Sequence, residues 1–218
     1  MKISAFNGSP RGNNSNSLVI LKWLLEKAEA EYSINNINLI DKHDEYLKEL
    51  DQSDALLIVL PLYTDAMPAI VMKFFENLSN YRTHIQGKQV LYIVHSGFPE
   101  GFHSLPLKSY LENLSNKLNL VHYGVVIMGG SEGTRHMPPK MLRKKQAYFN
   151  KIGSDFASGK PLDNEVRQAL FEPERFNKFQ QIGFSIFRTL GFTDAYWDKN
   201  LKKNDAYDQR FATPYKDE

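Results

Sequence analysis

The chain has 218 residues, 42% of them hydrophobic, which suits one globular domain or one domain with an appendage. Its net charge of +2 is too small to indicate a nucleic acid or an anionic membrane as a partner. The absence of cysteine excludes disulfides, thiolate metal sites, iron–sulfur clusters and cysteine nucleophiles, and no metal site is expected. No secretory signal and no apolar run of about 18 residues occurs, so we expect no membrane segment and a cytoplasmic location.

The chain opens on a strand, a polar loop and a helix. Residues 3–6 form a short apolar run that predicts a buried strand, and the glycines and proline of residues 7–12 end it. A polar stretch follows up to Ser17, and apolar residues at helical spacing then predict a helix over residues 15–31.

The junction between this strand, loop and helix is suited to bind an anion. The N–H groups and the positive dipole end of a helix N-terminus attract phosphate. Asn14 and the other Asn and Ser residues of the loop add neutral donors, and Arg11 adds a guanidinium. The loop lacks the lysine of a Walker loop and the three spaced glycines of a dinucleotide fingerprint, which favours a monophosphate. The alternative is a loop that only caps the helix.

Strands and helices alternate through the following 100 or so residues, by the sequence-pattern criteria for each. Near-continuous apolar runs predict strands that are buried on both faces, as in a parallel sheet. This alternation predicts a doubly wound α/β sheet, in which the loops after the first, third and fourth strands meet at one edge. The expected strands are 34–40, 54–60, 89–94 and 121–128, and the expected helices are 44–50, 68–80 and 107–118.

Two further loops fall at the same edge. The loop over residues 61–68 is apolar and carries Tyr63 and Met67, which can contact a flat aromatic ligand; a tight turn that packs its own aromatic side chain is the alternative. In the loop over residues 95–101, glycines permit close approach and Phe98 can cover a ring edge. We interpret His95 as a structural hydrogen-bonding residue, so no catalytic residue is assigned.

The last third of the chain is different. A polar loop with Arg135 and His136 precedes a helix expected over residues 140–158, whose basic residues 143–145 suit a solvated face better than a polyanion site. We expect residues 1–158 to form the main domain and residues 159–218 a helical extension that packs on the domain or on a partner subunit. Its aromatic and aliphatic side chains must be buried somewhere: Phe176, Phe179, Ile182, Ile186, Phe187, Leu190, Trp197, Tyr207, Phe211 and Tyr215.

Residues 2–130 resemble the flavodoxin-like NAD(P)H-dependent FMN reductases. The resemblance lies in Gly8-Ser9-Pro10-Arg11 with the Asn and Ser residues after it, in Pro61-Leu62-Tyr63 with Met67-Pro68, and in His95-Ser96-Gly97. It implies a five-stranded parallel sheet of order 2-1-3-4-5 and bound FMN. The implied phosphate ligands are Ser9, Arg11, Asn16 and Ser17, with Asn14 as a further donor. The implied ring contacts are Pro61, Leu62, Tyr63, Ser96, Gly97 and Phe98, with Thr64 and Met67 in the same loop.

The resemblance implies an oxidoreductase that takes hydride from NAD(P)H onto FMN and then reduces a small acceptor such as a quinone, a free flavin, or a nitro or azo compound. The flavin carries this chemistry and the protein positions it. A one-electron flavodoxin-type carrier and a non-enzymatic flavodoxin-like binding module are the alternatives. We also expect a homodimer, because a flavin at a sheet edge needs shielding that the aromatic extension of a neighbouring subunit can provide.

Overall fold

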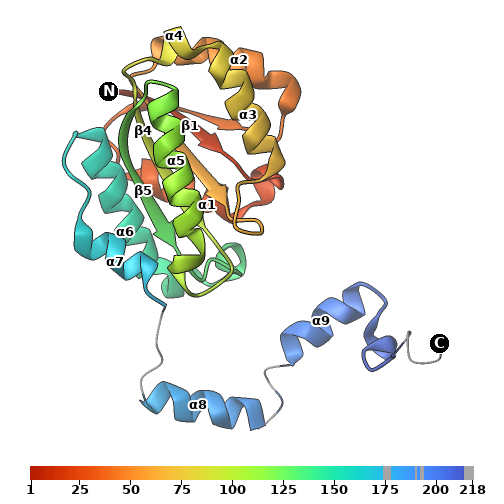
Figure 1. The fold of residues 1–218 in the computed structure, drawn as a ribbon. Coiled ribbons are helices and arrows are strands. Elements are labelled where there is room, and N and C mark those ends of the chain that lie inside the picture. Colours follow the sequence, from red (N-terminus) through yellow and green to blue (C-terminus); the bar gives the residue numbers. More distant parts are fainter. Residues whose placement is uncertain (174–177, 190, 192–193, 214–218) are drawn as a thin grey trace. The chain divides into compact units, whose positions relative to one another are not determined.

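The structure, a computed structural model, describes residues 1–173, 178–189, 191 and 194–213, apart from the side chains of Gln180, Phe187 and Tyr196. Contacts divide the chain into two units, Met1–Glu174 and Arg175–Glu218. The first contains the sheet (Figure 1), and all residues of the predicted site belong to it by their numbers.

A five-stranded parallel sheet forms the centre of the first unit, in the order β2-β1-β3-β4-β5. This order confirms the predicted doubly wound, flavodoxin-like fold. Because β1 lies between β2 and β3, the chain reverses its direction of winding there. The loops after β1 and β3 lead to helices on opposite faces of the sheet and leave a crevice between them at the carboxyl edge. The strands are β1 (Lys2–Asn7), β2 (Glu31–Asn36), β3 (Ala55–Pro61), β4 (Gln89–His95) and β5 (Val121–Met128).

Strand β3 shows why the sheet is covered on both faces. All seven of its residues are buried, and successive side chains point to opposite faces. Leu56, Ile58 and Leu60 belong to one hydrophobic cluster, whereas Leu57 and Val59 belong to another. A strand that is apolar on both sides is therefore stable only between two layers of helices.

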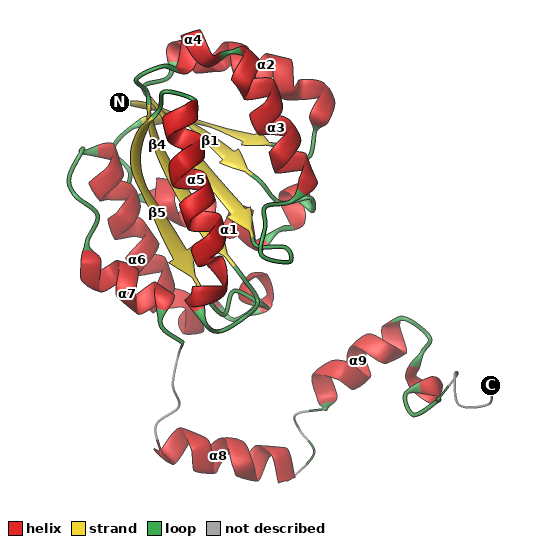
Figure 2. Cartoon of the chain, in the orientation of Figure 1, coloured by secondary structure: helices red, strands yellow, loops and turns green. Residues whose placement is uncertain are grey.

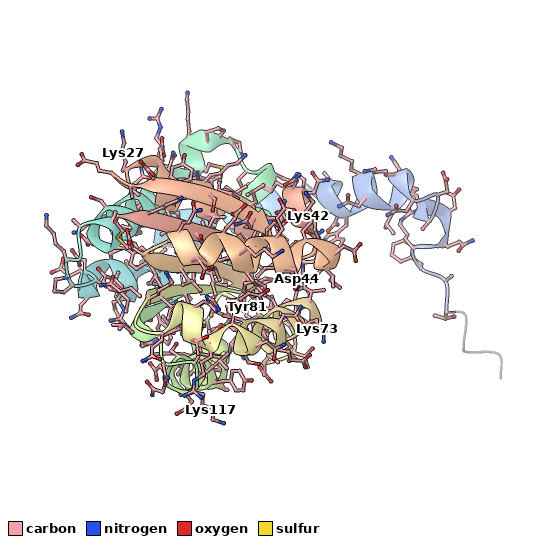
Figure 3. All side chains as sticks on the ribbon, turned by 90° about the horizontal axis from the view of Figure 1, so that it is seen from above. Lys27, Lys42, Asp44, Lys73, Tyr81 and Lys117 are labelled. Atoms are coloured by element: carbon pink, nitrogen blue, oxygen red, sulfur yellow. The ribbon has the colours of Figure 1, made fainter. Side chains whose placement is uncertain are left out.

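The two clusters define the helical layers (Figure 2). The helices α2, α3 and α5 contribute to the first cluster, and α1 and α6 pack together on the other face, where α7 adds Val166 and Leu170. Exposed side chains such as Lys27, Lys73 and Lys117 lie at the periphery (Figure 3). The helices of this unit are α1 (Asn16–Glu26), α2 (His43–Glu49), α3 (Ala69–Asn80), α4 (Arg82–Ile85), α5 (Leu105–Lys117), α6 (Pro139–Ala157) and α7 (Asn164–Phe171).

Two predicted boundaries at the start of the chain are wrong. The first helix ends at Glu26 instead of residue 31, and the second strand covers Glu31–Asn36 instead of residues 34–40. Strand β2 lies at the edge of the sheet beside β1 and three of its six residues are exposed, so most of its residues are polar and the apolar pattern does not mark it. The apolar Ile37 that suggested a later strand lies buried just past the end of β2.

The second unit contains α8 (Lys178–Thr189) and α9 (Ala195–Lys203), which agrees with a helical C-terminal extension. Of the aromatic and aliphatic side chains of the extension that were expected to be buried, Phe179, Ile182 and Ile186 are 86%, 58% and 57% exposed in this unit. Phe176, Leu190 and Tyr215 lie outside the described residues. The first unit includes α7, so the contacts place its end at Glu174, beyond the predicted boundary at residue 158. The role of the extension stays a prediction.

Candidate functional site

A pocket opens at the carboxyl edge of the sheet, where the loops after β1, β3, β4 and β5 converge. The pocket thus lies at the topological switch point, where open α/β sheets bind their ligands. Its lining residues are Ser9, Arg11, Ser15, Asn16, Pro61, Leu62, Tyr63, His95, Ser96, Gly97, Ser131 and Glu132.

The loop after β1 is held from beneath by Asn7, which is fully buried. Its amide nitrogen donates to the carbonyl of Gly12 at 2.8 Å, and its amide oxygen accepts from the backbone N–H of Ser9 at 3.2 Å. Gly12 adopts a φ of +52°, and a Cβ there would lie 2.8 Å from the side chain of Asn38. The loop is therefore a preformed turn whose conformation requires glycine.

Helix α1 begins directly under this turn. Ser15 is its N-cap, and its hydroxyl oxygen accepts from the N–H of Leu18 at 3.2 Å. The other N–H groups of the first turn have no carbonyl within the helix to bond. The exposed Arg11 and the hydroxyl of Ser9 lie at the same end, so the donor set suits an anion.

His95 connects three of the loops. Its Nε2 lies 2.7 Å from Ser17 Oγ and its Nδ1 lies 2.9 Å from Ser131 Oγ. Ser131 Oγ also donates its single proton to the carbonyl of Ser96 at 2.8 Å, so it accepts from His95 and Nδ1 carries the proton. Nε2 of the neutral ring then accepts from Ser17. Burial lowers the pKa of His95 to about 4, in agreement with this neutral state.

The loop after β5 closes on the loop after β1 through Arg135. The backbone N–H of Arg135 donates to Asn16 Oδ1 at 3.0 Å, and Asn16 Nδ2 donates to the carbonyl of Ser131 at 2.8 Å. The guanidinium of Arg135 donates to the carbonyl of Asn14. A second guanidinium thus lies at the N-terminal end of α1, in addition to that of Arg11.

The loop after β3 forms a tight turn. The backbone of Tyr63 exchanges two hydrogen bonds with Ala66, at 2.8 and 3.1 Å, and Thr64 and Asp65 both have positive φ. The turn leaves the side chain of Tyr63 46% exposed at the pocket. It also uses the N–H of Tyr63, while that of Leu62 donates to the carbonyl of His95. Neither N–H is therefore available to a ligand.

The loop after β4 offers open backbone beside the pocket. A Cβ on Gly97 would meet its nearest neighbour, Glu132 Oε2, only at 3.5 Å, and within the part of the chain described the N–H of Gly97 has no hydrogen bond. The ring of Phe98 is 54% exposed and lies 4.5 Å from the ring of His103, between centroids. The carboxylate of Glu132 lines the pocket beside this loop.

The predicted site residues fall into two groups. Eight of them line the pocket together: Ser9, Arg11, Asn16, Pro61, Leu62, Tyr63, Ser96 and Gly97. Five predicted residues do not line it: Asn14, Ser17, Thr64, Met67 and Phe98. Met67 is 4% exposed and belongs to the core. The hydroxyl of Ser17 donates its hydrogen bond to His95 Nε2 and so is not available to a ligand. A ligand role for any of these residues stays a prediction.

Sequence reasoning missed Asn7, Ser131, Glu132 and Arg135. Asn7 could have been found, because a polar residue at the end of an apolar strand faces the site at the carboxyl edge. The loop after β5 ends at the same edge, so its polar residues carried the same signal.

A family profile described as NADPH-dependent FMN reductase matches residues 1–182 of the chain. This match reaches well beyond residue 130, where the resemblance recognised from motifs ended. It includes the loop that carries Arg135. No curated protein matches the sequence.

Solved structures of the same fold agree with this match. The Trp repressor binding protein from Bacillus subtilis is 20% identical over 74% of this chain and 98% of its own, with a TM-score of 0.54. An FMN-dependent NADH-azoreductase from Bacillus anthracis str. Ames Ancestor, solved in complex with FMN, is 16% identical over 72% and 100%, with a TM-score of 0.54. An NADPH-quinone reductase from P. pentosaceus is 14% identical over 71% and 97%, with a TM-score of 0.53. Because these structures are 20% identical to the chain or less, the likeness shows the fold alone.

Proposed function

Because the chain belongs to the NADPH-dependent FMN reductase family, we propose that it binds FMN in the pocket at the carboxyl edge and uses NADPH to reduce a small apolar acceptor. The family is one of NAD(P)H-dependent oxidoreductases, so the chain is an enzyme of this kind. One observation carries the proposal: anion donors, an exposed tyrosine and open glycine backbone line a single pocket, although they come from three different loops.

The phosphate end of FMN fits the loop after β1. Ser9 and Arg11 supply a hydroxyl and a guanidinium, and the first turn of α1 supplies backbone N–H groups. Asn16 uses both polar atoms of its side chain within the protein, and Ser17 donates its hydroxyl proton to His95. These two residues therefore contribute their backbone N–H groups and not their side chains.

The ring end fits the loops after β3 and β4. The exposed ring of Tyr63 provides an apolar face of the size that a flat heterocycle needs, and buried Pro61 and Leu62 form the adjoining wall. The N–H of Gly97, which makes no hydrogen bond within the described residues, can donate to a ring heteroatom. Because the N–H groups of Leu62 and Tyr63 are already used, we assign ring recognition mainly to Gly97 and to stacking on Tyr63.

When bound, FMN supplies the redox chemistry: it accepts hydride from the nicotinamide and passes electrons to the acceptor. No proton transfer is assigned to His95, because it is buried, neutral and hydrogen-bonded on both nitrogens and thus cannot exchange a proton with a substrate. The residues of the three loops bind the ligand, hold it at the edge of the sheet and leave one side accessible through the exposed Tyr63 and Phe98.

The acceptor class follows from the surroundings of this pocket. Exposed apolar side chains surround it or lie in the loops beside it, including Tyr63, Phe98 and Phe102. A planar, uncharged acceptor such as a quinone suits this surface better than a charged one. A free flavin, a nitro compound or an azo compound shares the same planar aromatic chemistry, and the acceptors are to be ranked by kcat/KM.

The experiment is anaerobic reduction followed by turnover. FMN-loaded protein is mixed with NADPH or NADH, and bleaching of the flavin absorbance gives the rate of hydride transfer for each coenzyme. Addition of a quinone then restores the absorbance with catalytic consumption of NADPH. A protein that is reduced but supports no multiple turnover would be a one-electron carrier, and a protein that takes up no FMN would be a non-enzymatic module; either result overturns the proposal.

We also propose that the protein is a homodimer. The second unit exposes Phe179, Ile182 and Ile186 on one helix, and a second copy of the chain is the partner that would bury them. None of the helices in the described part of the chain has the length and hydrophobicity to cross a bilayer. A cytoplasmic location stays a prediction. Light scattering at micromolar concentration gives the mass of a dimer on this proposal, and the mass of a monomer contradicts it.

A further inference from the structure

We propose that Arg135 binds the phosphate group of FMN as a second guanidinium beside Arg11, and that His95 and Ser131 position it there. The inference rests on the proposed function, because it concerns the phosphate end of the same pocket. It assigns a ligand role to the loop after β5.

The contacts of Arg135 place its charge at the loop after β1, where the proposed function puts the phosphate. Its backbone N–H donates to Asn16 Oδ1 at 3.0 Å, and Asn16 lines the pocket. Its guanidinium donates to the carbonyl of Asn14, two residues before the helix begins. Arg135 therefore contacts the loop on which the phosphate would sit, from a position 119 residues away from Asn16 in the sequence.

The guanidinium has donors left for a ligand. It carries five N–H groups, of which one bonds the carbonyl of Asn14 and one lies towards His136 Nε2 at 3.0 Å. Arg135 is exposed, and within the described residues its guanidinium makes no hydrogen bond besides these two. Its remaining N–H groups can therefore bond a phosphate oxygen without breaking either contact.

The charge of the pocket explains why a second cation is needed. Among the residues that line the pocket, Arg11 is cationic, Glu132 is anionic and His95 is neutral, so the lining has no net charge. A phosphate monoester carries about −1.5 to −2 charges at pH 7. A neutral lining gives such a group little electrostatic stabilisation, and Arg135 makes the phosphate end positive.

A chain of buried hydrogen bonds positions this loop. His95 donates from Nδ1 to Ser131 Oγ at 2.9 Å, and Ser131 Oγ donates to the carbonyl of Ser96 at 2.8 Å. The carbonyl of Ser131 accepts from Asn16 and from the N–H of Thr134, which begins the turn that carries Arg135. His95 acts here as a positioning residue, because it contacts the loop and not the phosphate.

The test compares FMN with riboflavin, which has the same ring and no phosphate. Arg135→Gln keeps a donor for the carbonyl of Asn14 but removes the charge, and Arg135→Lys keeps the charge. We expect Arg135→Gln to weaken FMN binding by about tenfold or more and riboflavin binding by less than about twofold. Arg135→Lys should stay within about threefold of the wild type, because a lysine retains most of the charge interaction. Arg143→Gln, which removes an exposed charge from α6, is the matched control and should leave both affinities unchanged.

The dependence of FMN binding on salt distinguishes two roles for Arg135: direct contact with the phosphate, and structural support of the loop alone. If Arg135 contacts the phosphate, FMN affinity of Arg135→Gln falls less steeply with salt than that of the wild type. Equal losses in the Gln and Lys variants, or equal losses for FMN and riboflavin, would show that Arg135 only braces the loop and would overturn the inference. Unchanged FMN affinity in Arg135→Gln would also overturn it. A wild-type protein without FMN affinity would instead refute the proposed function, and melting temperatures establish that each variant is folded.

Discussion

The network around His95 predicts that this one side chain makes the protein sensitive to acid. His95 is 4% exposed, and burial lowers its pKa from 6.5 to about 4. In the unfolded chain the ring regains its ordinary pKa, so between pH 6.5 and pH 4 the unfolded state binds a proton that the folded state does not bind. The contribution of His95 to stability is thus complete above pH 6.5, falls as the pH is lowered, and stops falling below pH 4.

The size of this effect follows from the two pKa values. Between pH 7.5 and pH 4.5 the linkage lowers the free energy of unfolding by about 2.5 kcal/mol. His95→Gln removes the titrating group but keeps an acceptor for the hydroxyl of Ser17, so the variant lacks this loss while every other group titrates as in the wild type.

The assay is urea unfolding of both proteins at several pH values. Between pH 7.5 and pH 4.5, the free energy of unfolding of the wild type should fall by about 2.5 kcal/mol more than that of His95→Gln. A difference that stays constant with pH would refute the reasoning, because it would mean that His95 is protonated equally in the folded and unfolded states.

Two other substitutions test packing and electrostatics. Gly153→Ala in α6 should destabilise the fold by at least about 3 kcal/mol, because its Cβ would lie 1.7 Å from the carbonyl oxygen of Leu24 in α1. Ser154→Ala, at an exposed position of the same helix, should change the urea midpoint little, and a similar midpoint for both variants would contradict the close packing. Glu132→Gln should tighten FMN binding by about threefold and raise the reduction potential of the bound flavin, since a negative charge leaves the pocket wall. Weaker binding, measured by calorimetry, would show that the carboxylate accepts a hydrogen bond from the ligand.

The sequence was informative wherever burial produced an unambiguous pattern. The strands β3, β4 and β5 are apolar runs between helices, and their predicted ends agree with the structure to within one residue. Strand β2 was misplaced because an exposed edge strand has no need of apolar residues. The topology then followed from the alternation of elements and from the handedness of parallel connections.

The sequence predicted the loops that form the site, but it did not predict which of their side chains line the pocket. The loops after β1, β3 and β4 each carried their own signal in glycine, proline or polar residues. Which side chains point into the pocket depends on hydrogen bonds between loops, and the sequence does not show these. Ser17 is an example, because it bonds a histidine 78 residues away, and Arg135 is another, because it reaches Asn14 across 121 residues.

On the proposed function, the loop after β1 binds the phosphate of FMN. Calorimetric titration of the purified protein with FMN and with riboflavin tests it most directly, together with Arg11→Ala. We expect FMN to bind at least about tenfold more tightly than riboflavin, and Arg11→Ala to abolish most of this preference. Equal affinity for the two flavins in the wild type, or an undiminished preference in Arg11→Ala, would contradict it.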